Sequence, residues 1–258
     1  INTPFNQIMK KTTPPAYSLG LDYGTNSVRA LLVNVSNGDE VATAIYGYEH
    51  GTKGVVLGRD PNMARQHPAD YLKGAEVTIK KVLSLAKKAD KTFKPEQVIG
   101  LGVDTTGSTP MPVDSKGRSL TETKRFAENP DAMAWLWKDH TSVAEAAEIT
   151  ALARKIRPQY IAKCGGAYSS EWFFSKILRC SRVAPKVFEA AYLWVEIADW
   201  IPAVLTGTEH PDTLTVGICA AGHKGMYNKS WGGYPDEEFL GSLSPKLAAL
   251  RPYVRSKA

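Results

Sequence analysis

The chain has 258 residues, of which 43% are hydrophobic, and its formal net charge is +6 at pH 7. This length and apolar content are sufficient for a well-buried core in one large domain or two small ones. Lysine and arginine are scattered along the chain, which argues against a nucleic-acid-binding stripe. No apolar run approaches the ~18 residues of a membrane span, and residues 1–16 lack the apolar segment of a secretory signal.

The three cysteines, Cys164, Cys180 and Cys219, form neither a C-x-x-C motif nor a cluster with histidine. An odd number without a pairing pattern is typical of reduced thiols. We therefore expect a cytoplasmic protein that binds neither nucleic acid nor a membrane.

The N-terminal part of the chain predicts a loose arm followed by an antiparallel meander. Residues 1–16 are largely polar and end in two prolines and an alanine, which indicates an arm without regular structure. Apolar segments bounded by turn residues then predict strands over 17–22, 28–35 and 41–48. The turn at 36–39 joins the last two strands as a hairpin.

A helix and one further strand are expected after the meander. Pro68 stands where a helix can begin, and apolar residues recur at helical spacing as far as Ala86. The apolar run over 98–103 predicts a buried strand that ends at Asp104 and joins the sheet in parallel. This order is that of one actin-like, ribonuclease-H-like lobe, an α/β fold with a mixed five-stranded sheet. The glycines of the run do not open a helix, so a dinucleotide-binding fold is disfavoured.

The second half of the chain is predicted to be largely helical. The expected helices cover 130–140, 142–155, 169–180, 185–190 and 196–206, and Gly207 terminates the last of them. Residues 207–235 are rich in glycine and threonine, which predicts loops near a functional site.

The turn between the first two predicted strands has the composition of a phosphate-binding site. Gly24 removes a Cβ atom, so the backbone N–H groups of the turn can approach phosphate oxygens. Thr25 and Ser27 add hydroxyl donors, and Asp22 supplies a hard oxygen for hydrated Mg²⁺. We predict that this turn, including Asn26, binds phosphate groups and that Asp22 binds the metal. An ordinary hairpin with a polar tip is the alternative interpretation.

Six stretches, taken together, carry a family resemblance. They are GLDYGTNSVR at 20–29, GVDTTGST at 102–109, LWKDH at 136–140, GGAYSSEW at 165–172, DWIPAVLTGT at 199–208 and AAGHK at 220–224. In this order they resemble the FGGY carbohydrate kinases, and within that family they are most similar to the ribulokinase branch. The first stretch is generic to actin-like kinases, whereas the other five are more specific. The likeness extends from about Tyr17 to Tyr253.

The resemblance implies an enzyme with two actin-like lobes, of which the first binds the sugar and the second supplies most of the nucleotide pocket. Such kinases use ATP and Mg²⁺ to phosphorylate a sugar hydroxyl, and the protein contributes mainly positioning and charge stabilisation. The ribulokinase branch converts L-ribulose to its 5-phosphate in L-arabinose catabolism. The implied partners are a pentulose and a nucleotide.

The resemblance also implies which residues contact the sugar. Gly107 and Ser108 match the loop that meets the sugar, and Trp137 and Lys224 match sugar-contacting positions. Asp104 ends a buried strand at the expected edge of the cleft. Three of these residues have a structural alternative, which is core packing for Trp137, a surface position for Lys224 and a loop cap for Asp104.

The chain departs from the family in length. The general-base aspartate of the family lies in a stretch that has no counterpart before Ala258, and the adenosine-binding motifs are also absent. We therefore expect residues 17–258 to be the N-terminal, sugar-binding domain without the nucleotide-binding domain. A chain without the general base and the nucleotide lobe is expected not to turn over substrate by itself. The lobe face that would contact the second lobe is then exposed to water, and self-association through this face into a homodimer stays an open alternative.

Two other functions stay open at this point. The first is a xylulokinase or another FGGY kinase for a pentulose or polyol, although the Thr-Thr-Gly-Ser-Thr loop at 105–109 favours the ribulokinase branch. The second is a non-catalytic sugar-binding module on the same fold, because a fold alone does not establish an activity.

Overall fold

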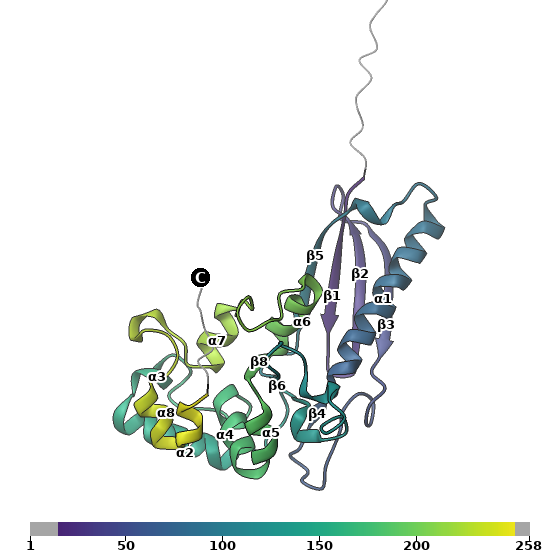
Figure 1. Cartoon of the computed structure of the whole chain (residues 1–258). Helices are drawn as coiled ribbons and strands as arrows, with labels where there is room; N and C mark the ends of the chain where they lie inside the picture. Colours follow the sequence, from purple (N-terminus) through teal and green to yellow (C-terminus); the bar gives the residue numbers. More distant parts are fainter. Residues whose placement is uncertain (1–14, 251–258) are drawn as a thin grey trace, which may run out of the picture.

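The computed structural model describes residues 15–250, so the arm predicted over 1–16 lies almost entirely outside the described residues. The main sheet has the strand order β3-β2-β1-β5, with β1 antiparallel to β2 and parallel to β5 (Figure 1). Its strands are β1 (Tyr17–Tyr23), β2 (Ser27–Asn34), β3 (Glu40–Gly47) and β5 (Val98–Thr105). The predicted mixed α/β fold class is confirmed.

The expectation of five strands in this sheet is wrong for the described residues, which form four. The remaining short strands pair in two separate ribbons. β4 (Arg65–Gln66) pairs with β7 (Ala134–Trp135), and β6 (Pro110–Val113) pairs with β8 (Leu193–Glu196). Ser108, with a φ of 61°, turns the chain between β5 and β6, and β6 then pairs with β8 instead of the main sheet.

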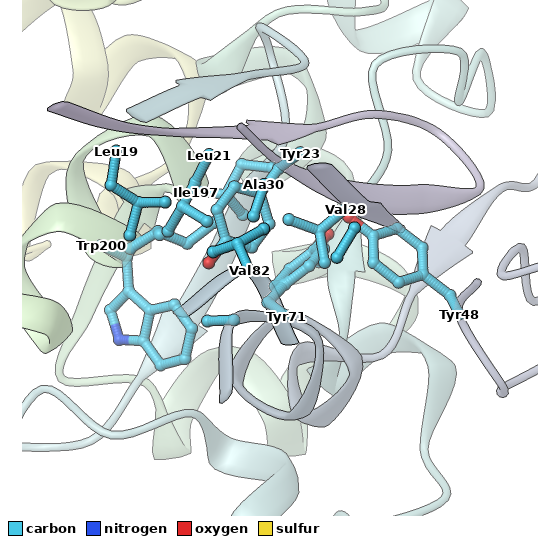
Figure 2. Close-up of a cluster of buried hydrophobic side chains, with 14 of the residues drawn as sticks. Leu19, Leu21, Tyr23, Val28, Ala30, Tyr48, Tyr71, Val82, Ile197 and Trp200 are labelled. Atoms are coloured by element: carbon cyan, nitrogen blue, oxygen red, sulfur yellow. The ribbon is translucent and has the colours of Figure 1, made fainter. Parts of the chain in front are cut away.

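Helices cover one face of the main sheet. α1 (Pro68–Ala89) packs against β2 and β3, and α6 (Ile197–Thr206) packs against β5. Alternation along β1 directs Leu19, Leu21 and Tyr23 into the core that these helices share with the sheet. Figure 2 shows these side chains between the sheet and α1, with Trp200 of α6 beside Leu19.

The start of α1 follows from its local sequence. Pro68 occupies the first helical position, and Nδ1 of His67 accepts a hydrogen bond from Ala69 N at 3.2 Å, which caps the helix. Lys87 and Lys88 lie in the last turn, where positive charge is favourable. The predicted start of this helix is therefore confirmed.

The second half of the described chain is largely helical, as predicted. Its α-helices are α2 (Val143–Ile156), α3 (Gln159–Ala162), α4 (Phe173–Val183), α5 (Pro185–Ala190), α6, α7 (Ile218–Lys224), α8 (Glu237–Leu243) and α9 (Pro245–Ala248). Short 3₁₀ helices are η1 (Pro95–Gln97), η2 (Leu120–Glu122), η3 (Pro130–Ala132) and η4 (Lys229–Trp231). Within the described residues, no helix has both the length and the apolar character that a membrane crossing requires.

The helix predicted over 130–140 does not form. After η3 the backbone is extended at Met133, and β7 pairs with β4. Trp135 is fully buried, and the Cζ atom of Arg65 lies 3.5 Å from the centroid of its ring. Tertiary packing against β4 therefore overrides the local helical spacing in this segment.

Candidate functional site

The hairpin tip (residues 24–27) and the β5 loop (residues 105–109) leave the same edge of the main sheet. Tyr23 and Thr105, the last residues of the parallel strands β1 and β5, lie in register. Just beyond them, Thr106 N donates a hydrogen bond to Tyr23 O at 3.0 Å. The two loops that carry most of the predicted site residues therefore lie side by side.

A glutamine from β4 holds the hairpin tip. Gly24 N donates to Ser27 O at 2.9 Å, which closes the turn. Nε2 of Gln66 donates to Gly24 O at 3.3 Å and to Thr25 O at 2.8 Å. The hydroxyl of Tyr71, in α1, donates to Oε1 of Gln66 at 2.7 Å, so its amide is oriented from the helix side.

The hairpin tip keeps donors available for an anion. Within residues 15–250, the backbone N–H groups of Thr25 and Asn26 have no hydrogen-bond partner. The Asn26 side chain instead donates from Nδ2 to Lys53 O at 2.5 Å. Two adjacent unpaired N–H groups at a turn are suited to phosphate oxygens, so the residues present fit a nucleotide phosphate.

Two carboxylates lie on the sheet face opposite α1, next to these loops. Asp22 of β1 and Asp104 of β5 are in register on adjacent strands, and both are exposed. Nη1 of Arg29 lies 3.4 Å from Oδ2 of Asp22, so Arg29 braces this carboxylate. Residues 15–250 hold no group of three or more His, Cys, Asp or Glu side chains suited to a metal. Mg²⁺ usually keeps several waters and needs only one or two carboxylates plus phosphate oxygens, so this pair fits a hydrated metal.

Lys224 reaches the β5 loop from the end of α7. A Cβ atom added at Gly107 would lie 2.9 Å from Nζ of Lys224. The hydroxyl of Tyr168 donates to the Lys224 carbonyl, which fixes the end of the helix. Ser108 is buried, and its hydroxyl has no partner within the described part of the chain. The ammonium of Lys224 and the backbone of Gly107 therefore face each other.

Trp137 contacts the hairpin tip. Its indole Nε1 donates to Oγ1 of Thr25 at 3.0 Å, and the residue is 39% exposed. Core packing was the structural alternative for Trp137, but the fully buried tryptophan of this segment is Trp135. Trp137 thus presents part of its ring to solvent beside the hairpin tip. The roles of the predicted residues in binding sugar, phosphate and metal stay predictions.

Three residues hold the loops in place but were not among the predicted site residues: Gln66, Lys176 and Glu196. Lys176 lies in α4 beside Phe173 and Ile177 on the buried face of the helix. A lysine within an apolar helical stripe could have indicated a buried charge at this position. Burial lowers the pKa of Lys176 and raises that of Glu196, and the opposite charge of each partly counteracts the shift. No local pattern marked Gln66 or Glu196.

A further buried carboxylate, Asp199 of α6, supports the start of α7. Its Oδ1 accepts a hydrogen bond at 2.8 Å from the N–H of Gly217, the N-cap residue of α7. Burial raises the pKa of Asp199 from 3.8 to about 6. Between these values the folded chain retains a proton that the unfolded chain releases, so stability falls as the pH rises through this window.

We therefore expect Asp199→Asn to increase stability at pH 7 by up to about 3 kcal/mol, the free energy that corresponds to this pKa shift. The amide oxygen can still accept from Gly217 N. Urea unfolding of both chains at pH 4 and pH 7 measures the effect, and the gain should shrink at pH 4. An equal difference at both pH values would show that ionisation of Asp199 does not affect stability.

Comparison with known proteins identifies relatives over nearly the whole chain. The model for the FGGY family of carbohydrate kinases, N-terminal domain, matches residues 17–258. The ribulokinase of Vibrio parahaemolyticus is 44% identical over 240 residues, which are 93% of this chain and 42% of that protein. The ribulokinase of Shouchella clausii is 40% identical over 239 residues, which are 91% of this chain and 41% of that protein. The chain therefore spans about two fifths of the length of these relatives.

Solved structures agree on the fold. The xylulose kinase of Rhodospirillum rubrum superposes with a TM-score of 0.65 at 21% identity, and the match covers 92% of this chain and 41% of that kinase. The glycerol kinase of Plasmodium falciparum with ADP superposes with a TM-score of 0.62 at 14% identity, and the match covers 92% of this chain and 42% of that one. These confirm the expected actin-like architecture, and the family match confirms the resemblance found in the sequence. The chain belongs to the FGGY family of carbohydrate kinases and corresponds to the N-terminal domain of that family.

Proposed function

We propose that this chain is the sugar-binding part of an ATP-dependent kinase that converts L-ribulose to L-ribulose 5-phosphate, a step of L-arabinose catabolism. The observation that carries the proposal is the adjacency of the hairpin tip and the β5 loop at one edge of the sheet. This arrangement can bring a sugar hydroxyl next to a phosphate. The similarity to proteins named ribulokinase supports L-ribulose as the sugar.

The sugar side of the site would be formed by four residues. Lys224 can donate to hydroxyl groups, and the exposed part of the Trp137 ring can pack against C–H groups. Gly107 leaves the backbone of the β5 loop open to a close approach. The Ser108 hydroxyl has no partner within the described chain, but it is buried, so the β5 loop would have to shift for this group to donate to the sugar. These groups would orient the substrate, which is the main contribution of a protein to phosphoryl transfer.

The phosphate side would be formed by the hairpin tip and the two carboxylates. The N–H groups of Thr25 and Asn26 can donate to phosphate oxygens, and Asp22 and Asp104 can hold hydrated Mg²⁺. ATP supplies the phosphoryl group when bound. In this account Asp104 serves the metal, in addition to the sugar contact predicted for it from the sequence.

Calorimetry and a coupled ADP-release assay on the 258-residue chain test the proposal. We expect L-ribulose to bind more tightly than D-xylulose. We expect no ADP release above the blank from these 258 residues, because they span only about two fifths of the length of the ribulokinases that they match. Tighter binding of D-xylulose would favour the xylulokinase alternative. Turnover at the rate of an intact ribulokinase would contradict the proposal that these residues form only the sugar-binding part of the kinase.

Two further expectations are part of the proposal. A non-catalytic sugar-binding module would bind sugar with an affinity that ATP and Mg²⁺ do not change, even when joined to a nucleotide-binding domain. A cytoplasmic location and a homodimer also stay proposals. Light scattering during gel filtration measures the oligomeric state directly, and a mass of 28.2 kDa would contradict the dimer.

A further inference from the structure

The peptide group between Ser108 and Thr109 in the β5 loop is held on both sides by buried charged side chains. Nζ of Lys176, in α4, donates to Ser108 O at 2.7 Å. Oε2 of Glu196, at the end of β8, accepts from Thr109 N at 2.7 Å. Lys176 is fully buried and Glu196 is 5% exposed. Two elements that lie 68 and 87 residues away from this peptide group in the sequence therefore occupy both of its hydrogen-bonding atoms. We call Lys176 and Glu196 the peptide clamp.

The conformation of Ser108 explains why this peptide group needs support. Its φ of 61° lies in the left-handed region, which is unfavourable for a residue with a Cβ atom. This turn presents Gly107 to Nζ of Lys224, where an added Cβ would lie only 2.9 Å away. A relaxation of Ser108 toward a common backbone conformation would move Gly107 away from this position.

The ammonium group of Lys176 also joins the β5 loop to the segment that carries Trp137. Nζ of Lys176 also donates to Trp135 O at 3.1 Å and to Leu136 O at 2.8 Å. The three carbonyl acceptors match the three protons of an ammonium group. One acceptor belongs to the β5 loop and two belong to the residues directly before Trp137. A single buried charge therefore fixes two of the predicted sugar-contacting segments relative to each other.

We propose that the peptide clamp consists of positioning residues for sugar binding, which hold the β5 loop and the Trp137 segment in the arrangement that the sugar recognises. The inference rests on the proposed sugar-binding function. A lysine with a purely structural role would stabilise the fold without affecting sugar affinity beyond that loss of stability. The two roles therefore differ in a measurable way.

The test combines calorimetry with L-ribulose and amide hydrogen exchange at Thr109 in the 258-residue chain. Lys176→Met keeps the apolar stem and removes the ammonium. Glu196→Ala removes the acceptor of Thr109 N, whereas Glu196→Gln keeps an acceptor oxygen. Glu145→Gln is the matched control, because Glu145 is also buried but is held by Arg182 at 3.4 Å.

We expect Lys176→Met and Glu196→Ala each to weaken L-ribulose binding about tenfold and to speed exchange at Thr109 about tenfold, as for the loss of one hydrogen bond to a charged group. Glu196→Gln should restore both quantities to within about threefold of the unmodified chain, because the hydrogen bond remains. Glu145→Gln should lower the melting temperature and change neither quantity.

Folded Lys176→Met with unchanged affinity and unchanged exchange at Thr109 would overturn the inference. If that variant does not fold, the comparison of Glu196→Ala with Glu196→Gln decides, and equal affinities of these two would overturn it. If the unmodified chain binds no pentulose, the proposed function fails. Exchange at Thr109 needs no ligand, so it reports on the peptide clamp independently of that outcome.

Discussion

Replacement of Gly107 by alanine is expected to weaken L-ribulose binding by about tenfold or more, because a hydrogen bond from a charged donor is worth about 1.5–3 kcal/mol. The fold is expected to stay intact. The new Cβ atom would lie 2.9 Å from Nζ of Lys224 and 3.5 Å from its Cε. The end of a flexible side chain can move away at little cost to stability. Lys224 would then leave the position from which it faces the β5 loop.

The control for this substitution is Gly102→Ala in β5. A Cβ atom at Gly102 would meet no heavy atom within 4 Å, so the same chemical change is made without displacing a neighbour. Calorimetry with L-ribulose and thermal unfolding should show that Gly102→Ala keeps both the affinity and the melting temperature. If Gly107→Ala bound L-ribulose as tightly as Gly102→Ala, Lys224 would not contribute to sugar binding from its present position.

Replacement of Arg65 by methionine is expected to lower the free energy of unfolding by about 3–5 kcal/mol, as for the removal of one partner from a buried ion pair. Arg65 is 2% exposed, and its Nη1 donates to Oδ2 of Asp139, which is fully buried. The Cζ atom of Arg65 also lies 3.5 Å from the ring centroid of Trp135. The substitution would leave the Asp139 carboxylate buried without its main counter-charge.

Urea unfolding measures this effect, and the melting temperature should fall by roughly 10 °C for a chain of this size. Arg118→Met provides the comparison, because Arg118 forms an ion pair with Asp114 at 2.8 Å while its side chain is 50% exposed. A surface pair of this kind is worth at most about 1 kcal/mol. Equal losses for the two substitutions would show that burial of the Arg65 ion pair adds nothing to stability.

Local patterns were sufficient to predict the elements that are stabilised by nearby residues. An apolar segment bounded by turn residues predicted a strand over 17–22, and β1 covers Tyr17–Tyr23. The helix predicted over 185–190 coincides with α5, where Pro185 occupies the first helical position. The position of the hairpin tip also followed from the sequence, because the turn lies directly between two such strands.

The parts that the sequence did not predict depend on contacts between distant segments. The segment over 130–140 has helical spacing, but pairing with β4 and the guanidinium of Arg65 hold Trp135 in an extended strand. The peptide clamp is of the same kind, because Lys176 and Glu196 reach the β5 loop from 68 and 87 residues away in the sequence. Periodicity in a single segment carries no information about such partners.

The most direct test of a single site for sugar and phosphate is an amide NMR titration of the 258-residue chain with L-ribulose and with L-ribulose 5-phosphate. We expect L-ribulose to shift the signals of Gly107, Ser108 and the Trp137 indole. The 5-phosphate should shift these and also the amides of Thr25 and Asn26, because one molecule then carries both groups. Shifts by the 5-phosphate that are confined to one of the two loops, or that lie on another face of the protein, would contradict the account.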